Sequence, residues 1–116
     1  MVTHTPWGPA QSQSLVAPGI TRVDTASHGG YHLSADRVRQ VPVCITPFAG
    51  SRQWYEEDSD WAVVALMWLD EFSAGLPGSG SEVDKIARAT LGAFHPDWIV
   101  AIDAAVAARA NGGAVA

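Results

Sequence analysis

The chain has 116 residues, a formal net charge of −5 and a hydrophobic content of 47%. This length fits one domain that spans 1–116, and the composition excludes a disordered chain. The longest apolar run, 61–69, is too short to cross a bilayer, so we expect no membrane contact. The N-terminus has no signal-peptide pattern, and a single cysteine, Cys44, cannot form an internal disulfide. Together these features predict a cytoplasmic protein.

The N-terminal third predicts an irregular arm followed by a β-hairpin. Prolines and glycines are frequent in 1–19, which is typical of irregular structure. The β-branched segment 20–26 predicts a strand, and 31–33 predicts its return strand. Gly29 and Gly30 separate the two strands, and glycine readily adopts the positive φ angles of a tight turn. We therefore place the turn of the hairpin at these two glycines.

The segment after the hairpin predicts a short helix and an edge strand. Ser34 is a typical N-cap for a helical turn over 35–39. Prolines flank an apolar stretch within 41–48, which predicts a third strand at the edge of the sheet, where a missing N–H is tolerated. Cys44 lies in this stretch, and we expect it to be a small core residue.

The second half of the chain predicts three helices. Apolar residues recur at helical spacing in 61–72 and occupy nearly the whole helix surface. Such a helix is either central in the domain or offers one face to a partner, which also allows a homodimer. The capping-box pattern at Ser81 predicts a second helix through Phe94. Pro96 introduces a third helix that ends near Ala110.

These elements indicate an α+β fold class. We expect a small antiparallel sheet, formed by a hairpin or three strands, covered by the three helices. No linker divides the chain, so the single domain includes the irregular arm 1–19 and a frayed tail over 112–116.

The first candidate site is the histidine hairpin, which contains His28, Gly29, Gly30 and His32. Glycine lets a backbone approach a ligand closely and leaves its amide free to bind an anion. His28 is then a candidate general base or metal ligand, with His32 as a second ligand. The alternative is that the glycines only form the turn and that the histidines flank it.

The second candidate site is the acidic segment, in which aromatic residues flank four carboxylates. Carboxylates this close raise one another's pKa values, which suits a general acid or base, and they attract hard cations. The alternative is that they cap the start of the following helix and are solvated. The residues of this candidate site are Trp54, Tyr55, Glu56, Glu57, Asp58 and Asp60.

The motifs of the chain predict neither a cofactor nor a metal site. The phosphate-binding loop, the dinucleotide fingerprint and the nucleophile elbow of hydrolases are absent from the sequence. A metal site built from His28, His32 and either Glu56 or Glu57 has no supporting ligand spacing.

Three motifs follow one another along the chain. They are Thr5-Pro6-Trp7-Gly8, Ala26-Ser27-His28-Gly29-Gly30, and Trp54-Tyr55-Glu56-Glu57-Asp58 continuing to Trp61-Ala62. In this combination the chain resembles an uncharacterised family of small domains in proteins of phages, plasmids and related mobile elements. The resemblance spans about 3–98 and brings no established reaction with it. It implies a mobile-element protein in a bacterial host, where neighbouring proteins often counteract host defence.

We therefore expect a binding protein that inhibits a host defence complex, of the anti-CRISPR or anti-restriction type. A CRISPR effector or restriction nuclease has basic grooves for nucleic acid, which the acidic segment would fit by charge complementarity. Trp54, Tyr55 and Trp61 are the expected aromatic anchors, and His28 is a further candidate binding residue, whose distance from the acidic segment the sequence does not determine.

Two alternatives belong to other functional classes. One is a small metal-dependent or acid/base hydrolase that uses His28 together with Glu56 or Glu57. The other is a regulator that contacts DNA, which the net charge of −5 disfavours, so we expect no direct nucleic-acid binding. The basic residues that such a contact would use are Arg22, Arg37, Arg39 and Arg52.

Overall fold

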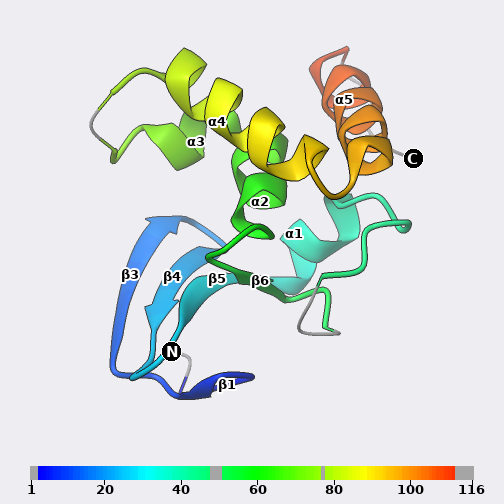
Figure 1. Cartoon of the computed structure of the whole chain (residues 1–116). Coiled ribbons are helices and arrows are strands. Elements are labelled where there is room, and N and C mark those ends of the chain that lie inside the picture. Colours follow the sequence, from blue (N-terminus) through cyan, green and yellow to red (C-terminus); the bar gives the residue numbers. More distant parts are fainter. Residues whose placement is uncertain (1–2, 48–50, 77, 112–116) are drawn as a thin grey trace.

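The computed structural model describes residues 3–47, 51–76 and 78–111, so the expected fraying of 112–116 lies outside the described residues. An antiparallel sheet carries stacked helices on one face, and a small hairpin lies on the other (Figure 1). The strands are β1 (His4–Thr5), β2 (Gly8–Pro9), β3 (Ser12–Ala17), β4 (Ile20–Asp24), β5 (Gly29–Leu33) and β6 (Trp54–Glu56). The helices are α1 (Ala35–Gln40), α2 (Trp61–Met67), α3 (Leu69–Ser73), α4 (Gly80–Gly92) and α5 (Pro96–Ala110). This architecture confirms the α+β fold class.

The main sheet has four strands in the order β3-β4-β5-β6, and all neighbours are antiparallel. Successive side chains of a strand point to opposite faces of the sheet. On the helical face, Ile20, Leu33 and Tyr55 have no solvent exposure and form the sheet side of the core. The strand predicted over 20–26 is confirmed as β4, which ends at Asp24.

The N-terminal segment forms strands rather than an irregular arm. β1 pairs with β2, and the Thr5 hydroxyl donates to the Gly8 carbonyl over 2.7 Å. Gly8 has a φ of 118°, a conformation that favours glycine. The prolines and glycines that suggested irregular structure lie at the ends and turns of short strands. The hairpin carries Trp7 to the sheet face opposite the helices, where its ring centre lies 5.5 Å from that of Trp54.

The turn of the predicted histidine hairpin comes before the two glycines. β5 already begins at Gly29, and the turn is closed by the Thr25 N–H, which donates to the His28 carbonyl over 2.7 Å. Gly30 serves a different purpose from the one expected. A Cβ at this position would lie 2.5 Å from the Trp7 ring and 2.5 Å from a carbonyl oxygen of β6. The lack of a Cβ at Gly30 thus lets the Trp7 ring and β6 approach the backbone of β5 closely. Its φ is not positive, so this glycine is not needed for a turn.

The strand predicted within 41–48 is not formed, and β6 takes its place in the sheet. Residues 41–47 form turns and irregular structure, in which the Ile45 N–H donates to the Pro42 carbonyl. Proline has no N–H to donate to a neighbouring strand, which limits pairing here. Ile45 is buried, but Cys44, which we expected in the core, is exposed. Residue 48 lies outside the described residues.

α2 is the centre of the molecule, as its apolar surface predicts. Every residue from Ala62 to Trp68 is buried, and α2 packs against α4, α5 and the sheet. The helix predicted over 61–72 is broken at Trp68, whose φ of −136° and ψ of 59° are not helical. Because the chain itself covers all sides of α2, the argument for a homodimer through an uncovered face of this helix no longer holds.

The remaining helices start close to their predicted positions. Ser34 caps α1 as predicted. The N-cap of α4 is Ser79 instead of Ser81, and its hydroxyl accepts from the Glu82 N–H over 3.2 Å. α5 has Pro96 in its first turn, as expected. None of the described helices is long and apolar enough to cross a membrane.

Gly30→Ala should destabilise the protein by about 1–3 kcal/mol, because the added methyl group has to displace the Trp7 ring or a backbone carbonyl. Urea unfolding followed by circular dichroism measures the change. Gly75→Ala is the matched control, since a Cβ there meets no atom within 4 Å and should be neutral or slightly stabilising. Equal stabilities of the two variants would contradict the close packing of Trp7 on Gly30.

Candidate functional site

The histidine hairpin and the acidic segment meet at one end of the sheet. The Gly29 N–H donates to Glu57 Oε2 over 3.0 Å, and the Glu57 N–H donates to the Gly29 carbonyl over 3.1 Å. In the adjoining ladder, Gly30 pairs with Glu56. The two motifs of the sequence therefore form one surface. We call this surface the acidic edge, and it consists of His28, Glu56, Glu57 and Asp58.

Arg22 of β4 neutralises part of the acidic edge. Its Nη2 lies 2.7 Å from Asp24 Oδ1 and 3.0 Å from Glu57 Oε1. The guanidinium also lies 5.3 Å from the centre of the Tyr31 ring, a cation–π contact that fixes its position. Glu57 is thus held by a guanidinium and by the Gly29 amide. Its carboxylate ties β4, β5 and β6 together at this end of the sheet.

Glu56 and Asp58 are the two carboxylates of the acidic edge that lack an arginine or lysine partner among the described residues. Partial burial raises the pKa of Glu56, and a hydrogen bond with Asp58 and repulsion by Asp58 and Asp60 raise it further. Attraction by His28 opposes this rise. The acidic edge therefore holds like charges that repel one another, and a cation from outside would relieve the repulsion.

The aromatic residues beside these carboxylates belong to the interior of the protein. Trp54 is 8% exposed, and Tyr55 is fully buried. On the outer face of the sheet, the ring of Trp54 contacts Trp7 at 5.5 Å and His32 at 4.7 Å, measured between ring centres. Trp61 is half-buried at the start of α2. Trp54 and Tyr55 are therefore too buried to anchor a partner, contrary to our expectation.

Asp60 and Tyr55 are also buried polar residues. Asp60 is 4% exposed at the N-cap position of α2, but its side chain makes no capping hydrogen bond, so the predicted capping role is not seen for it. Burial raises the pKa of Tyr55 to about 12, with Arg52 lowering and Asp60 raising it by smaller amounts. The Tyr55 hydroxyl has no hydrogen-bond partner among the described residues. Both groups lie too deep to contact a substrate at the acidic edge.

The two glycines do not provide the anion site that the hydrolase hypothesis requires. The Gly29 amide is already bound by the Glu57 carboxylate. Gly30 is covered by the Trp7 ring on one side. An incoming oxyanion would have to displace one of these groups, so the amides are not free to stabilise negative charge.

The residues considered as metal ligands, His28, His32 and either Glu56 or Glu57, do not form a ligand group among the described residues. Glu57 is held by Arg22, and His32 lies against Trp54. Burial lowers the pKa of His32, followed by a smaller effect of the N-terminal charge. His28 is exposed at the turn. In the part of the chain that the structure describes, no group of three or more His, Cys, Asp or Glu side chains is arranged to hold a metal ion.

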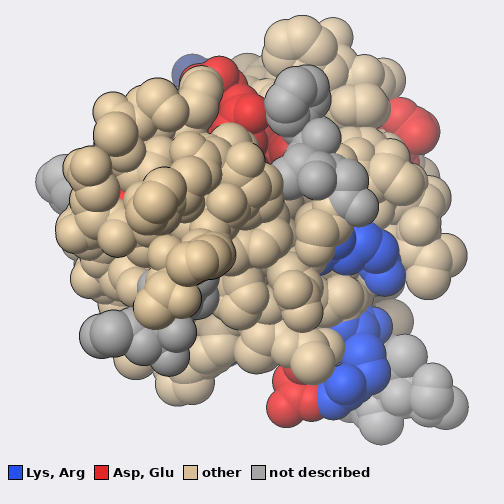
Figure 2. Space-filling model, turned by 90° about the horizontal axis from the view of Figure 1, so that it is seen from below, with Lys and Arg blue, Asp and Glu red and all other residues tan. Residues whose placement is uncertain are grey.

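The arginines that a nucleic-acid contact would use are bound within the chain. Besides Arg22, Arg37 pairs with Glu71 and Arg39 pairs with Asp36. Arg52 donates to two backbone carbonyls. The face drawn in Figure 2 consists mostly of uncharged residues, and most of its basic groups lie in a narrow strip on one side. This face therefore does not offer the broad basic surface that binds nucleic acid.

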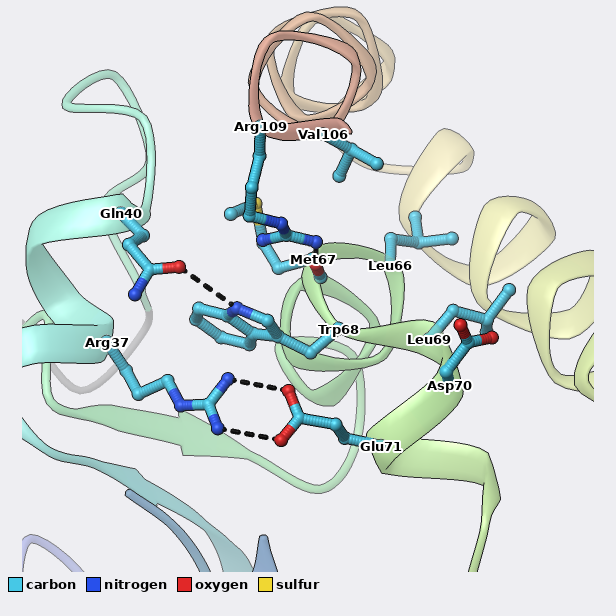
Figure 3. A pocket seen from close by; sticks show the side chains of 10 residues that line it. All are labelled: Arg37, Gln40, Leu66, Met67, Trp68, Leu69, Asp70, Glu71, Val106 and Arg109. Atoms are coloured by element: carbon cyan, nitrogen blue, oxygen red, sulfur yellow. Dashed lines mark hydrogen bonds and ion pairs between the residues drawn. The ribbon is translucent and has the colours of Figure 1, made fainter. Parts of the chain in front are cut away.

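Sequence reasoning missed a cavity of about 460 Å³ between α1, the α2–α3 break and the C-terminal end of α5 (Figure 3). Trp68 lines it, and its indole N–H donates to Gln40 Oε1 over 3.3 Å. Arg37 and Glu71 form a bidentate pair on one side, and Arg109 enters from α5 on the other. No motif marks the cavity, because its residues come from separate elements. In the sequence, the feature that could have pointed to the cavity is Arg109, the single basic residue of the alanine-rich α5.

Glu56→Gln should stabilise the protein at pH 7 by less than about 1 kcal/mol, because it removes a charge that partial burial and the neighbouring carboxylates disfavour. Because the pKa of Glu56 is raised, the native state binds more protons than the unfolded state at pH values just above the ordinary pKa of 4.5. The wild type therefore loses stability as pH rises through this range, and the advantage of the variant disappears as pH falls below it. Chemical unfolding at a series of pH values measures the difference.

Glu71→Gln is the matched variant with the opposite sign. The hydrogen bond from Arg37 lowers the pKa of Glu71, so its carboxylate stabilises the fold at neutral pH and loses this effect as pH falls through the lowered value. Glu71→Gln should therefore destabilise the protein at pH 7 and approach the wild type in acid. If Glu56→Gln instead behaved like Glu71→Gln, the acidic edge would not be repulsive.

The comparisons with known proteins identify a family. No curated protein and no solved structure matches the chain significantly. A family model described as a domain of unknown function, DUF7007, matches residues 1–112 and thus nearly the whole chain. This match supports the expectation of an uncharacterised family of small domains. The chain therefore belongs to the DUF7007 family.

Proposed function

We propose that the chain is a protein-binding domain that inhibits a bacterial defence complex, a CRISPR effector or a restriction nuclease, through its acidic edge. In this proposal Glu56 and Asp58 contact a basic, nucleic-acid-binding surface of the defence complex. His28 borders the contact and Glu57 supports it from within. The protein acts by occupying the surface, without a chemical step.

The observation that carries the proposal is the unneutralised charge of Glu56 and Asp58. Burial of the Glu56 carboxylate, together with the nearby Asp58, disfavours its charged form in the folded protein and raises its pKa. Lysine or arginine side chains of a partner would favour the charged form instead. Charge complementarity of this kind accelerates association and selects the partner.

The partner class follows from the context that the motifs imply. The resemblance to mobile-element domains implies a bacterial host in which neighbouring proteins often counteract defence, and this context supports the choice of partner. Defence nucleases must hold nucleic acid, and surfaces that do so are basic. A compact acidic edge on a small domain is complementary to such a surface.

The packing of the acidic edge decides which residues a test can change. Glu57 is bound by Arg22 and by the Gly29 amide, so its replacement would disturb the sheet. Asp60 is buried, so its replacement would also disturb the packing, and it is not changed in the test variants. Glu56 and Asp58 can be replaced by their isosteric amides with the least effect on packing.

The double variant Glu56→Gln/Asp58→Asn should weaken inhibition at least about tenfold, because each lost charge contact contributes roughly a kilocalorie per mole or more. Inhibition is measured as phage plating on hosts that carry one defined CRISPR or restriction system, and as DNA cleavage by the purified nuclease. The control Glu82→Gln/Asp97→Asn changes the net charge equally at exposed positions of α4 and α5. This control should inhibit like the wild type.

Added salt should weaken inhibition by the wild type, because the contact is electrostatic and partly exposed. The proposal is wrong if the protein inhibits none of the systems of either class. Equal loss of inhibition in both double variants would show that net charge matters and that the acidic edge is not the contact.

A further inference from the structure

The cavity beside Trp68 differs from the acidic edge in position and in charge. It lies between α1, the α2–α3 break and α5, on the helical side of the molecule (Figure 3). Its volume of about 460 Å³ falls in the range of pockets that bind small molecules. Its lining combines aliphatic side chains with arginines.

The two arginines of the cavity differ in how many of their N–H groups are used. The Arg37 guanidinium forms four hydrogen bonds, two in a bidentate pair with Glu71 and two to the Pro18 carbonyl. It also lies 5.1 Å from the centre of the Trp68 ring. Arg37 therefore builds the wall of the cavity and keeps Glu71 neutralised.

Arg109 has unused donors on the opposite side. Its Nη2 donates to the Met67 carbonyl at the end of α2, and no carboxylate of the described residues pairs with it. A guanidinium has five N–H donors in a planar fork that matches the two oxygens of a carboxylate or phosphate. The bond to Met67 fixes one end of this fork and leaves the rest for a ligand. Arg109 is thus a positioned cation at the rim of the cavity that forms no ion pair with the described residues, although its charge contributes to lowering the pKa of Glu71.

The remaining lining defines the body of the ligand. Leu66 and Val106 provide an apolar surface next to Arg109, and Trp68 continues it. Asp70 lies on the α3 side, away from the α5 side from which Arg109 enters (Figure 3). A negative group would be repelled near Asp70 and attracted near Arg109, so a ligand with one charged end has a single favourable orientation.

We propose that this cavity binds a small amphiphilic oxyanion, a carboxylate or a phosphate monoester with a short apolar body, and that Arg109 holds its charged end. The apolar body lies against Leu66 and Val106. The site is separate from the acidic edge and does not depend on the protein–protein contact proposed for that surface.

The proposal is tested by titrating the full chain with defined compounds. NMR monitors binding through the chemical shifts of the Trp68 indole N–H and of the Arg109 side chain. The probes are hexanoate, hexyl phosphate, inorganic phosphate and 1-hexanol. At least one of the first two should give saturable shifts at both residues. Inorganic phosphate lacks the apolar body and hexanol lacks the charge, so each should bind at least tenfold more weakly.

Variants of Arg109 separate its charge from its structural contact. Arg109→Gln should weaken binding of the amphiphile at least tenfold. Arg109→Lys keeps the charge and a donor for the Met67 carbonyl but loses the fork, so it should bind with intermediate affinity. Arg39→Gln is the matched control, because it removes an exposed arginine outside the cavity and should bind like the wild type.

Val106→Phe tests the cavity without altering Arg109. The larger side chain should fill the cavity and abolish binding of the amphiphile. The amide spectrum of each variant verifies its fold. Absence of saturable shifts with every probe would overturn the proposal. So would wild-type binding by Arg109→Gln or Val106→Phe, and so would inorganic phosphate that binds as tightly as hexyl phosphate.

Discussion

The burial of α2 on all its sides is the constraint on which the rest of the structure depends. A helix without a polar stripe cannot lie at a surface, so the sheet, α4 and α5 have to surround it. The break at Trp68 allows the next turns to change direction, and α3 then packs against β3 and α4. The break also leaves room for the cavity, where Arg109 of α5 donates to the Met67 carbonyl and ties the last helix to the central one.

A second contact, on the opposite face of the sheet, determines the position of the acidic edge. Trp7 packs on Gly30 and Trp54, so the N-terminal hairpin clamps β5 and β6 from outside. This clamp holds the two strands at the register in which the Gly29 amide meets the Glu57 carboxylate. Arg22 then completes the junction from β4. The acidic edge is therefore a product of the sheet's register and not of a flexible loop.

The sequence predicts the helical half better than the sheet, for a physical reason. Caps, prolines and apolar periodicity act within a few residues, which is why Ser34 and Pro96 mark helix starts correctly. The role of Gly30 depends on Trp7, which is distant in the chain and meets it only after the hairpin folds back. β6 is likewise a strand because β5 offers it a partner, whereas the apolar stretch near Cys44 has none. Neither the contact of Gly29 with Glu57 nor the isolation of Arg109 follows from local spacing.

The distribution of the charges connects the fold with function. Arg22 and Arg37 form pairs that link distant elements, and they do so with Glu57 and Glu71. Among the charges that form no ion pair within the described residues are Glu56 and Asp58 at the end of the sheet and Arg109 on α5. These groups lie on different elements, so the fold does not let them neutralise each other. Charges that a fold leaves unpaired at a cost in stability are typical of surfaces and cavities that bind. Their opposite signs are the basis of the two contacts proposed above, with a basic protein surface for one and with an oxyanion for the other.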